Sequence, residues 1–243
     1  MENNRKKLSS EVLTAGGNNY PLSTIYYSLF FIISILLAAI FIKFPQIDIY
    51  VSGLFYIEGQ KFYLKENSIL MFLHNSVTYV TTFMAVLWIS LIIATSIKKR
   101  PVFGLSRIRA IYLLLALIIG PGIVVNAIFK DQWGRARPSQ IEMFGGKSEF
   151  TPAFIISDQC ESNCSFVSGD PSVGFYLLAL ALAIPRYRKL FICASLSAGV
   201  VLSATRIIQG GHFLSDTIFS GIFTFTVIYL LYIALLKVEA KQQ

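Results

Sequence analysis

Three short stretches of this sequence carry residue types that together could bind and transfer a phosphate group. They are Lys130-x6-Arg137-Pro138, Ser168-Gly169-Asp170 and Arg206-x5-His212-x3-Asp216. Arginine presents a planar fork of donors that matches phosphate, and lysine presents a compact charge. A phosphoryl group in transit carries negative charge on three oxygens, so several fixed donors stabilise it. We therefore predict that Lys130, Arg137 and Arg206 bind a phosphate.

The second stretch supplies neutral donors. Ser168 and Gly169 directly precede an apolar run that continues to Ile184. If that run is a helix, its N-terminus attracts anions through unpaired N–H groups and the helix dipole. Gly169 would allow the backbone to approach a ligand closely. We predict that Ser168 and Gly169 donate to the same phosphate.

The third stretch offers a nucleophile. His212 and Asp216 are four residues apart, so they share one face of a helix that begins there. The carboxylate could hold one ring nitrogen and leave the other as an unprotonated attacker. Taken singly, Asp216 could be a helix cap, His212 an interfacial residue, and the cations lipid headgroup ligands. The occurrence of all three stretches at the ends of apolar segments favours a catalytic site.

The surrounding segments are those of a membrane protein. Hydrophobic residues make up 55% of the 243 residues and charged residues only 14%, which is too apolar for an ordinary soluble domain. We predict an all-α polytopic protein, with six transmembrane helices in one bundle formed by the single domain 1–243. The expected spans are about 24–43, 74–97, 108–129, 171–186, 190–207 and 216–236. Gly120-Pro121-Gly122 should interrupt the third span.

Positive charge predicts the orientation. Most of the 21 lysines and arginines fall on the side of both termini and of the loop 98–109, which should be cytoplasmic. Lys130, Arg135, Arg137 and Arg206 are expected on the other side, as cations of the site. The net charge of +8 is thus accounted for by topology and an anion site, and no nucleic-acid partner is expected.

The loop 138–166 is the longest polar connection, and we expect it to cover the site on the outer side. Cys160 and Cys164 could form a disulfide in an oxidising compartment or remain two packed thiols. The two histidines, His74 and His212, are too few to complete a zinc site with this pair, so no metal or other cofactor is expected. His74, among apolar residues at the edge of the second span, is expected to be a packing or interface residue.

The order and spacing of the three stretches resemble the three-part signature of the type 2 phosphatidic acid phosphatase superfamily, six-helix lipid phosphatases that need no metal. The resemblance implies that Lys130, Arg137 and Arg206 hold the phosphate and that Ser168 and Gly169 donate to it. It also implies that His212 is the nucleophile and that Asp216 orients it.

The chain departs from that signature at two positions. The second motif usually ends in a histidine that acts as the general acid, and this sequence has Asp170 there. The third usually begins Ser-Arg, and this sequence has Thr205-Arg206. A carboxylate among cations should be ionised and a poor proton donor. Three roles stay open for Asp170: a protonated acid when phosphate is bound, a ligand of sugar hydroxyls, or a bystander to a leaving group that needs no acid.

Within the superfamily, Ser165 to Asp170 and Gln209-Gly210-Gly211-His212 look most like the bacterial lipid A 4'-phosphatases. The resemblance implies an inner-membrane enzyme with a periplasmic site, whose product attracts cationic antimicrobial peptides less strongly. Alternatives are the same chemistry on lipid A 1-phosphate, a prenyl diphosphate or phosphatidylglycerophosphate, or a non-catalytic protein that binds anionic lipids.

Overall fold

The computed structural model describes residues 22–59, 61–130 and 132–238 and is mostly helical. The ends at 1–21 and 239–243, for which a cytoplasmic location is predicted, lie outside the described residues. The chain divides into two compact units, Met1–Ile40 and Phe41–Gln243. Helix α2 (Leu22–Lys43) lies largely in the first unit. The second unit contains α3 (Gln46–Gly53), β1 (Tyr56–Ile57), β2 (Lys61–Phe62), α4 (Ser68–Lys98), α5 (Arg107–Leu117), η1 (Ile118–Lys130), η2 (Pro138–Gln140), η3 (Glu142–Phe144), α6 (Gly169–Tyr176), α7 (Leu178–Ala183), η4 (Pro185–Tyr187), α8 (Arg188–Ile208), α9 (Leu214–Leu231) and η5 (Tyr232–Leu236).

Four helical segments of the described chain are long and apolar enough to cross a membrane, namely Ser68–Lys98, Arg107–Lys130, Pro185–Ile208 and Leu214–Leu236. A fifth results if Ser28–Lys43 and Gln46–Gly53 form one broken span. The prediction of a helical, multi-pass membrane protein is confirmed, but a bundle of six spanning helices is not. The expected span 171–186 is the short apolar helix Gly169–Ala183, because Pro185 cannot donate to the helical hydrogen-bond ladder and ends it.

Helix α4 illustrates why these segments are helical. Asn67 caps its first turn, since the side-chain oxygen accepts from the backbone N–H groups of Ile69 at 3.0 Å and Leu70 at 3.3 Å. The helix then runs through a largely apolar sequence, without proline or glycine, to Lys98. Many of its large apolar side chains are exposed, including Phe72 and Phe83, as expected for a face that contacts lipid.

The predicted break in the third span is a change of helix type. Helix α5 ends at Leu117 and continues as the π-helix η1, which contains Pro121. Proline has no N–H and disturbs the ladder around it, so other donors must satisfy the nearby carbonyls. The Asn126 side-chain amide donates to the Pro121 carbonyl at 2.6 Å. The widened helix brings Asn126 next to the start of α6.

Helix α6 packs against α8, α9 and η1, and nearly all of its residues are buried. Small residues allow the close contact with α8: a Cβ on Gly174 would lie 2.6 Å from the Gly199 backbone nitrogen. The Phe175 ring lies against Gly199, and the Ser195 hydroxyl donates to the Phe175 carbonyl at 2.8 Å. These contacts fix the N-terminus of α6, where Ser168, Gly169 and Asp170 lie.

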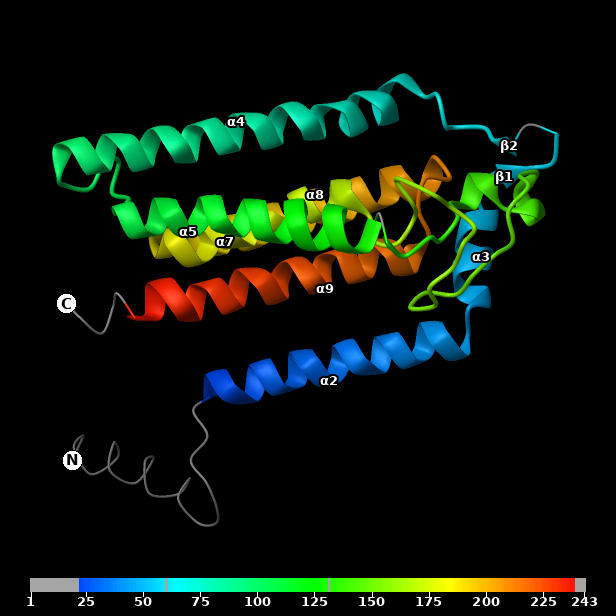
Figure 1. The fold of residues 1–243 in the computed structure, drawn as a ribbon, viewed down its shortest axis with the longest axis horizontal. Coiled ribbons are helices and arrows are strands. Elements are labelled where there is room, and N and C mark those ends of the chain that lie inside the picture. Colours follow the sequence, from blue (N-terminus) through cyan, green and yellow to red (C-terminus); the bar gives the residue numbers. More distant parts are fainter. Residues whose placement is uncertain (1–21, 60, 131, 239–243) are drawn as a thin grey trace, which may run out of the picture. The chain divides into compact units, whose positions relative to one another are not determined.

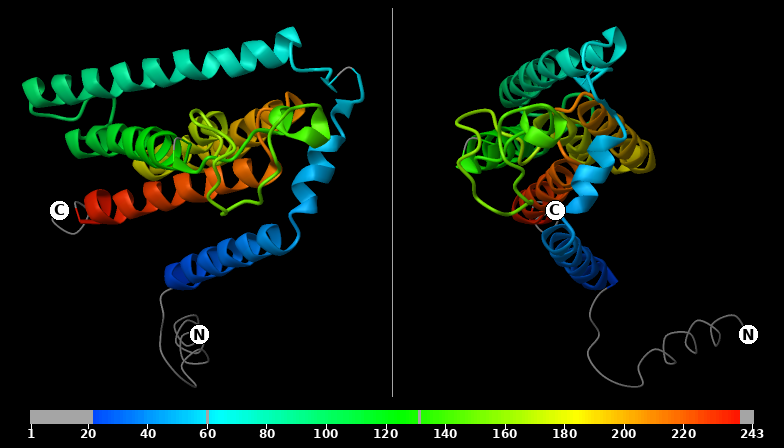
Figure 2. Two further views of the ribbon diagram at one scale, coloured as in Figure 1. Left: turned by 45° about the vertical axis from the view of Figure 1, so that its right-hand side comes forward. Right: turned by 90° about the vertical axis from the view of Figure 1, so that its right-hand side faces the viewer.

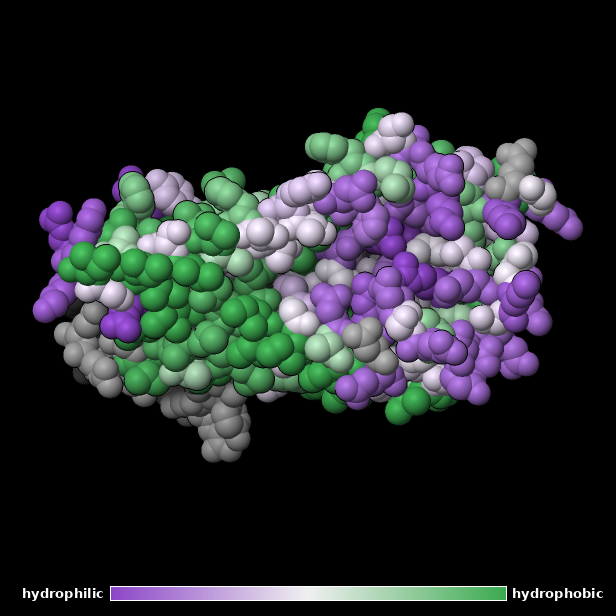
Figure 3. Space-filling view, turned by 45° about the horizontal axis from the view of Figure 1, so that its top comes forward, coloured by the Kyte–Doolittle hydropathy of each residue, from purple (hydrophilic) through white to green (hydrophobic). Residues whose placement is uncertain are grey.

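In the second unit, α4, α5, α8 and α9 run side by side, and α3, the β1–β2 hairpin and the loop 138–166 gather at one end of them (Figures 1 and 2). The hairpin was not predicted; its two strands have two residues each. Hydrophilic residues concentrate over the loop end, and a broad hydrophobic surface covers the helices (Figure 3). The three stretches that the sequence analysis singled out lie at this end of the helices.

Candidate active site

The imidazole of His212 is held through Nδ1, which lies 2.7 Å from the carbonyl oxygen of Ser165. A carbonyl only accepts hydrogen bonds, so Nδ1 carries the proton and Nε2 keeps its lone pair. The side chain is almost completely buried. Burial lowers the pKa of His212 to about 4, and the charges of Arg137 and Arg206 lower it while Asp216 opposes the shift. His212 is therefore a neutral imidazole with an unprotonated Nε2 near neutral pH.

Asp216 lies next to His212, as the sequence predicted, but at a longer distance than a direct hydrogen bond. Its Oδ2 is 3.7 Å from His212 Nδ1, beyond hydrogen-bond distance. That oxygen accepts instead from the Ser165 hydroxyl at 2.5 Å and from the Phe213 N–H at 2.7 Å. Asp216 thus caps α9 and fixes Ser165, and the carbonyl of Ser165 fixes His212.

Arg135 was predicted to be one of the cations of the site, and the structure places it in a buried ion-pair network instead. Its side chain is fully buried, and Nη1 donates to Asp216 Oδ1 at 2.6 Å while Nη2 donates to Asp48 Oδ2 at 2.9 Å. The guanidinium also lies 4.3 Å from the ring centroid of Phe213. Two carboxylates and an aromatic face therefore occupy Arg135, which joins α3 to the start of α9.

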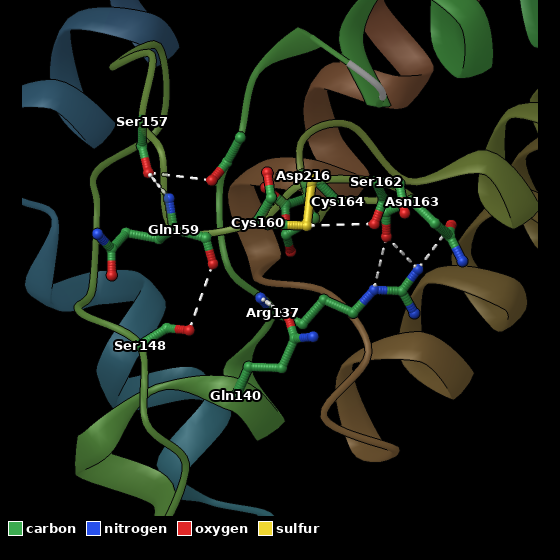
Figure 4. Close-up of a disulfide and its surroundings, with 12 residues drawn as sticks. Arg137, Gln140, Ser148, Ser157, Gln159, Cys160, Ser162, Asn163, Cys164 and Asp216 are labelled. Atoms are coloured by element: carbon green, nitrogen blue, oxygen red, sulfur yellow. Dashed lines mark hydrogen bonds between the residues drawn. A yellow bond between two sulfur atoms is a disulfide. The ribbon is translucent and has the colours of Figure 1, made fainter.

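Arg137 is held by the loop that contains the two cysteines. Its Nη2 donates to the carbonyl oxygen of Asn163 at 2.7 Å and to the Asn163 side-chain oxygen at 2.8 Å (Figure 4). Cys160 and Cys164 are joined by a disulfide, with their Cα atoms 5.7 Å apart, so Asn163 lies inside the closed loop. The disulfide therefore restricts the backbone that positions Arg137.

Arg206 lies at the end of α8 and approaches the N-terminus of α6. Its Nε is 3.3 Å from Asp170 Oδ2, and its Nη1 donates to Gln209 at 2.8 Å. Gly211 leaves space for the guanidinium, because a Cβ there would be 2.7 Å from Nη2. Asp170 and Gln209 thus hold the guanidinium from two sides.

Asp170 has a second partner that the sequence did not reveal. His74 Nδ1 of α4 lies 2.5 Å from Asp170 Oδ2. Arg206 Nε lies 3.3 Å from the same oxygen, so Asp170 has the two partners that stabilise an ionised carboxylate. His74, expected to be an interface or packing residue, instead contacts Asp170.

Ser168 and Gly169 lie beside these groups. The Ser168 N–H donates to the Asp216 carbonyl at 3.1 Å, and its buried hydroxyl has no hydrogen-bond partner among the described residues. A Cβ on Gly169 would lie 2.8 Å from the Asn126 side-chain oxygen. Ser168 thus keeps an unused hydroxyl at the start of α6, and Asn126 is a neighbour that the sequence analysis missed.

A polar cavity of about 520 Å³ opens between these elements. Its lining consists of Lys65, Met71, His74, Arg137, Ser139, Gln140, Ser162, Asn163, Arg206, Gln209 and Gly211. Lys130 does not belong to this lining; it ends η1, and its carbonyl accepts from the Cys164 N–H at 3.0 Å. The cavity thus joins Arg137 and Arg206 of the predicted set and adds His74. Among the described residues, no group of three or more His, Cys, Asp or Glu side chains could hold a metal ion.

Comparison with known proteins agrees with this chemistry. The model of the PAP2 superfamily matches residues 109–239. The lipid A 4'-phosphatase of Francisella tularensis subsp. novicida (strain U112) is 39% identical over 196 residues, which cover 79% of this chain and 87% of that protein. The lipid A 4'-phosphatase of Rhizobium leguminosarum is 30% identical over 221 residues, covering 85% and 93%.

A lipid A 1-phosphatase, from Rhizobium etli, is 35% identical over 120 residues, which cover 46% of this chain and 47% of that protein. No solved structure matches the chain. The family match extends over more than half of the chain, and the two 4'-phosphatases align with most of it. The chain therefore belongs to the PAP2 superfamily and is a membrane lipid phosphatase, a phosphoric monoester hydrolase.

Proposed function

We propose that the protein removes the 4'-phosphate of lipid A at the periplasmic face of the inner membrane, through a phosphohistidine on His212. The observation that carries the mechanism is the Ser165 carbonyl bond to His212 Nδ1, which leaves Nε2 as a free nucleophile. The preference for lipid A rests on the 4'-phosphatases that align with most of the chain.

In the first step, the lone pair of His212 Nε2 attacks the phosphorus and the bond from phosphorus to the sugar oxygen breaks. That oxygen leaves as an alcohol after it takes up a proton. In the second step, water attacks the phosphohistidine, the P–N bond breaks and inorganic phosphate leaves. Arg137 and Arg206 neutralise the charge that develops on the phosphoryl oxygens.

The neutral donors complete the phosphate site. The unpartnered Ser168 hydroxyl and the N-terminus of α6 at Gly169 supply hydrogen bonds close to Arg206. We keep Lys130 as a phosphate ligand in this proposal, because it precedes Arg137 at the spacing of the family signature. No step uses a metal ion.

We also retain six spans, with Gly169–Ala183 extended by η4 as the fourth and α2 as the first. Both termini are then cytoplasmic and the loop 138–166 is periplasmic. Loss of the 4'-phosphate reduces the negative charge of the lipid and hence its attraction for cationic antimicrobial peptides.

The test is phosphate release by the detergent-purified protein from lipid A that is labelled separately at the 4' and 1 positions, and from a prenyl diphosphate. We expect selective release from the 4' position, undiminished by a chelator and abolished in His212→Ala. Release from the 1 position alone, or from the diphosphate alone, would refute the substrate assignment but keep the chemistry. Activity that disappears with chelator and returns with a divalent ion would refute the metal-free mechanism.

A further inference from the structure

His74 and Asp170 form a pair that no step described above uses. They come from helices α4 and α6 and are 96 residues apart in the sequence, yet Nδ1 and Oδ2 lie 2.5 Å apart. The side chain of His74 is 36% exposed, and it lines the same cavity as Arg137 and Arg206. A buried structural pair would not present the imidazole to the substrate cavity.

The partners of the pair determine where its protons lie. An ionised carboxylate only accepts, so the hydrogen bond to Asp170 places a proton on His74 Nδ1. Nε2 is then the ring atom that exchanges a proton with a molecule in the cavity. Asp170 itself is a poor donor, because Arg206 Nε lies 3.3 Å from the same oxygen and favours the ionised carboxylate.

We propose that His74, positioned by Asp170, is the catalytic acid that protonates the leaving sugar oxygen, an inference that rests on the proposed function. A sugar alcohol is a poor leaving group, so its oxygen must gain a proton as the bond to phosphorus breaks. His74 Nε2–H gives that proton to the oxygen while His212 Nε2 forms its bond to phosphorus. In the second step, neutral His74 takes a proton from the attacking water, and the cycle closes with His74 protonated again.

The charges around His74 are consistent with this role. Asp170 is in contact with it, Arg206 reaches the same carboxylate oxygen, and Arg137 and Lys65 line the cavity that it faces. Asp170 therefore couples the proton donor to a cation of the phosphate site. His74 is the catalytic residue of the pair, and Asp170 is its positioning residue.

The test compares His74→Gln with wild type on two substrates. One is lipid A, whose leaving group needs a proton, and the other is 4-nitrophenyl phosphate with an alkyl tail, whose leaving group does not. We expect His74→Gln to lose on the order of 100-fold or more in kcat on lipid A, and less than about 10-fold on the aryl phosphate.

Controls separate chemistry from folding. Asn75→Ala, at an exposed position next to His74 on α4, should retain wild-type rates on both substrates. Asp170→Asn should also lose more on lipid A than on the aryl phosphate, and adding it to His74→Gln should cost little further. Thermal unfolding of each variant shows whether it is folded. If His74→Gln is not folded, the rates of Asp170→Asn on the two substrates are compared with wild type instead.

Three outcomes would overturn the inference. One is a His74→Gln rate within about 3-fold of wild type on lipid A. Another is an equal loss on both substrates, which would indicate phosphate binding or packing. The third is the absence of phosphate release from either substrate by the wild type, which would refute the proposed function and this inference with it.

Discussion

The surroundings of His212 favour its neutral form. Burial in the folded state and the two arginines act in that direction, while Asp216, which would favour the charged form, is 3.7 Å away and already accepts three other hydrogen bonds. In the proposed mechanism, His212 in this state is able to attack phosphorus at any pH above its low pKa. The same arrangement makes stability depend on pH.

The prediction at this scale concerns stability between pH 4 and pH 6.5. The pKa of His212 is about 4 in the folded protein and 6.5 when unfolded, so the unfolded state binds more protons in this interval. Stability should therefore fall as the pH decreases from 6.5 to 4, by ~3 kcal/mol from this residue. The midpoint of thermal unfolding in detergent, measured against pH for wild type and His212→Gln, checks it: the variant should show the smaller slope. Equal slopes would contradict the assigned pKa.

The sequence could predict those site residues that lie close to one another along the chain. His212 and Asp216 are one helical turn apart, and Ser168 and Gly169 stand directly before an apolar run. It could not reveal contacts between distant segments, such as His74 with Asp170, 96 residues apart, or Ser165 with His212, 47 residues apart. No periodicity joins such pairs. A lone histidine among apolar residues looks the same whether it packs or reacts.

At the scale of elements, loops and helix ends carry the site, and internal bonds fix them. Arg135 joins Asp48 of α3 to Asp216 of α9 and so supports the first turn of α9, although the sequence places it among the cations of the site. Removal of one partner would leave an uncompensated buried charge, which is strongly destabilising.

Hydropathy predicted the long helices correctly, but the two-residue strands and the broken helix α6–α7 are too short to produce a clear periodic signal.

A second prediction concerns the loop closed by Cys160 and Cys164. Removal of the disulfide should make the backbone at Asn163 more mobile. Arg137 should then be less well positioned, because Asn163 accepts three hydrogen bonds from its guanidinium. We expect the double variant Cys160→Ser, Cys164→Ser to lose about 10-fold in kcat/KM, equivalent to ~1.4 kcal/mol, and to remain folded. Reductant should have the same effect on wild type.

Cys193→Ser is the matched control, since Cys193 is the free cysteine of the described residues and lies on α8. It should be as active as wild type and should slow in reductant to the same extent. Unchanged kinetics in the double variant would show that Arg137 does not depend on the disulfide.

At the scale of the whole molecule, charge separates the two ends of the long helices. His74 lies in the second turn of α4, and Lys98, Lys99 and Arg100 lie at the opposite end of this 31-residue helix. A helix of that length extends ~46 Å, enough to pass through a bilayer with its headgroups. In the proposed orientation, the basic end lies on the cytoplasmic side and the cavity on the other, as the positive-inside rule predicts.

The third prediction tests this orientation with single cysteines at two exposed positions, Arg100→Cys and Lys147→Cys, in a Cys193→Ser background. In intact spheroplasts, a membrane-impermeant maleimide should label Lys147→Cys at once and Arg100→Cys only after detergent is added. The parent without either new cysteine should remain unlabelled. The reverse pattern would place the site in the cytoplasm.

The contact between His74 and Asp170 crosses the border of the region that defines the superfamily, because residues 109–239 include Asp170 but not His74. The C-terminal half therefore depends on a side chain of α4. A chimera that joins this region to N-terminal helices without a histidine at the position of His74 would leave the Asp170 carboxylate without its imidazole. Such a recombination would have to exchange α4 together with the signature motifs.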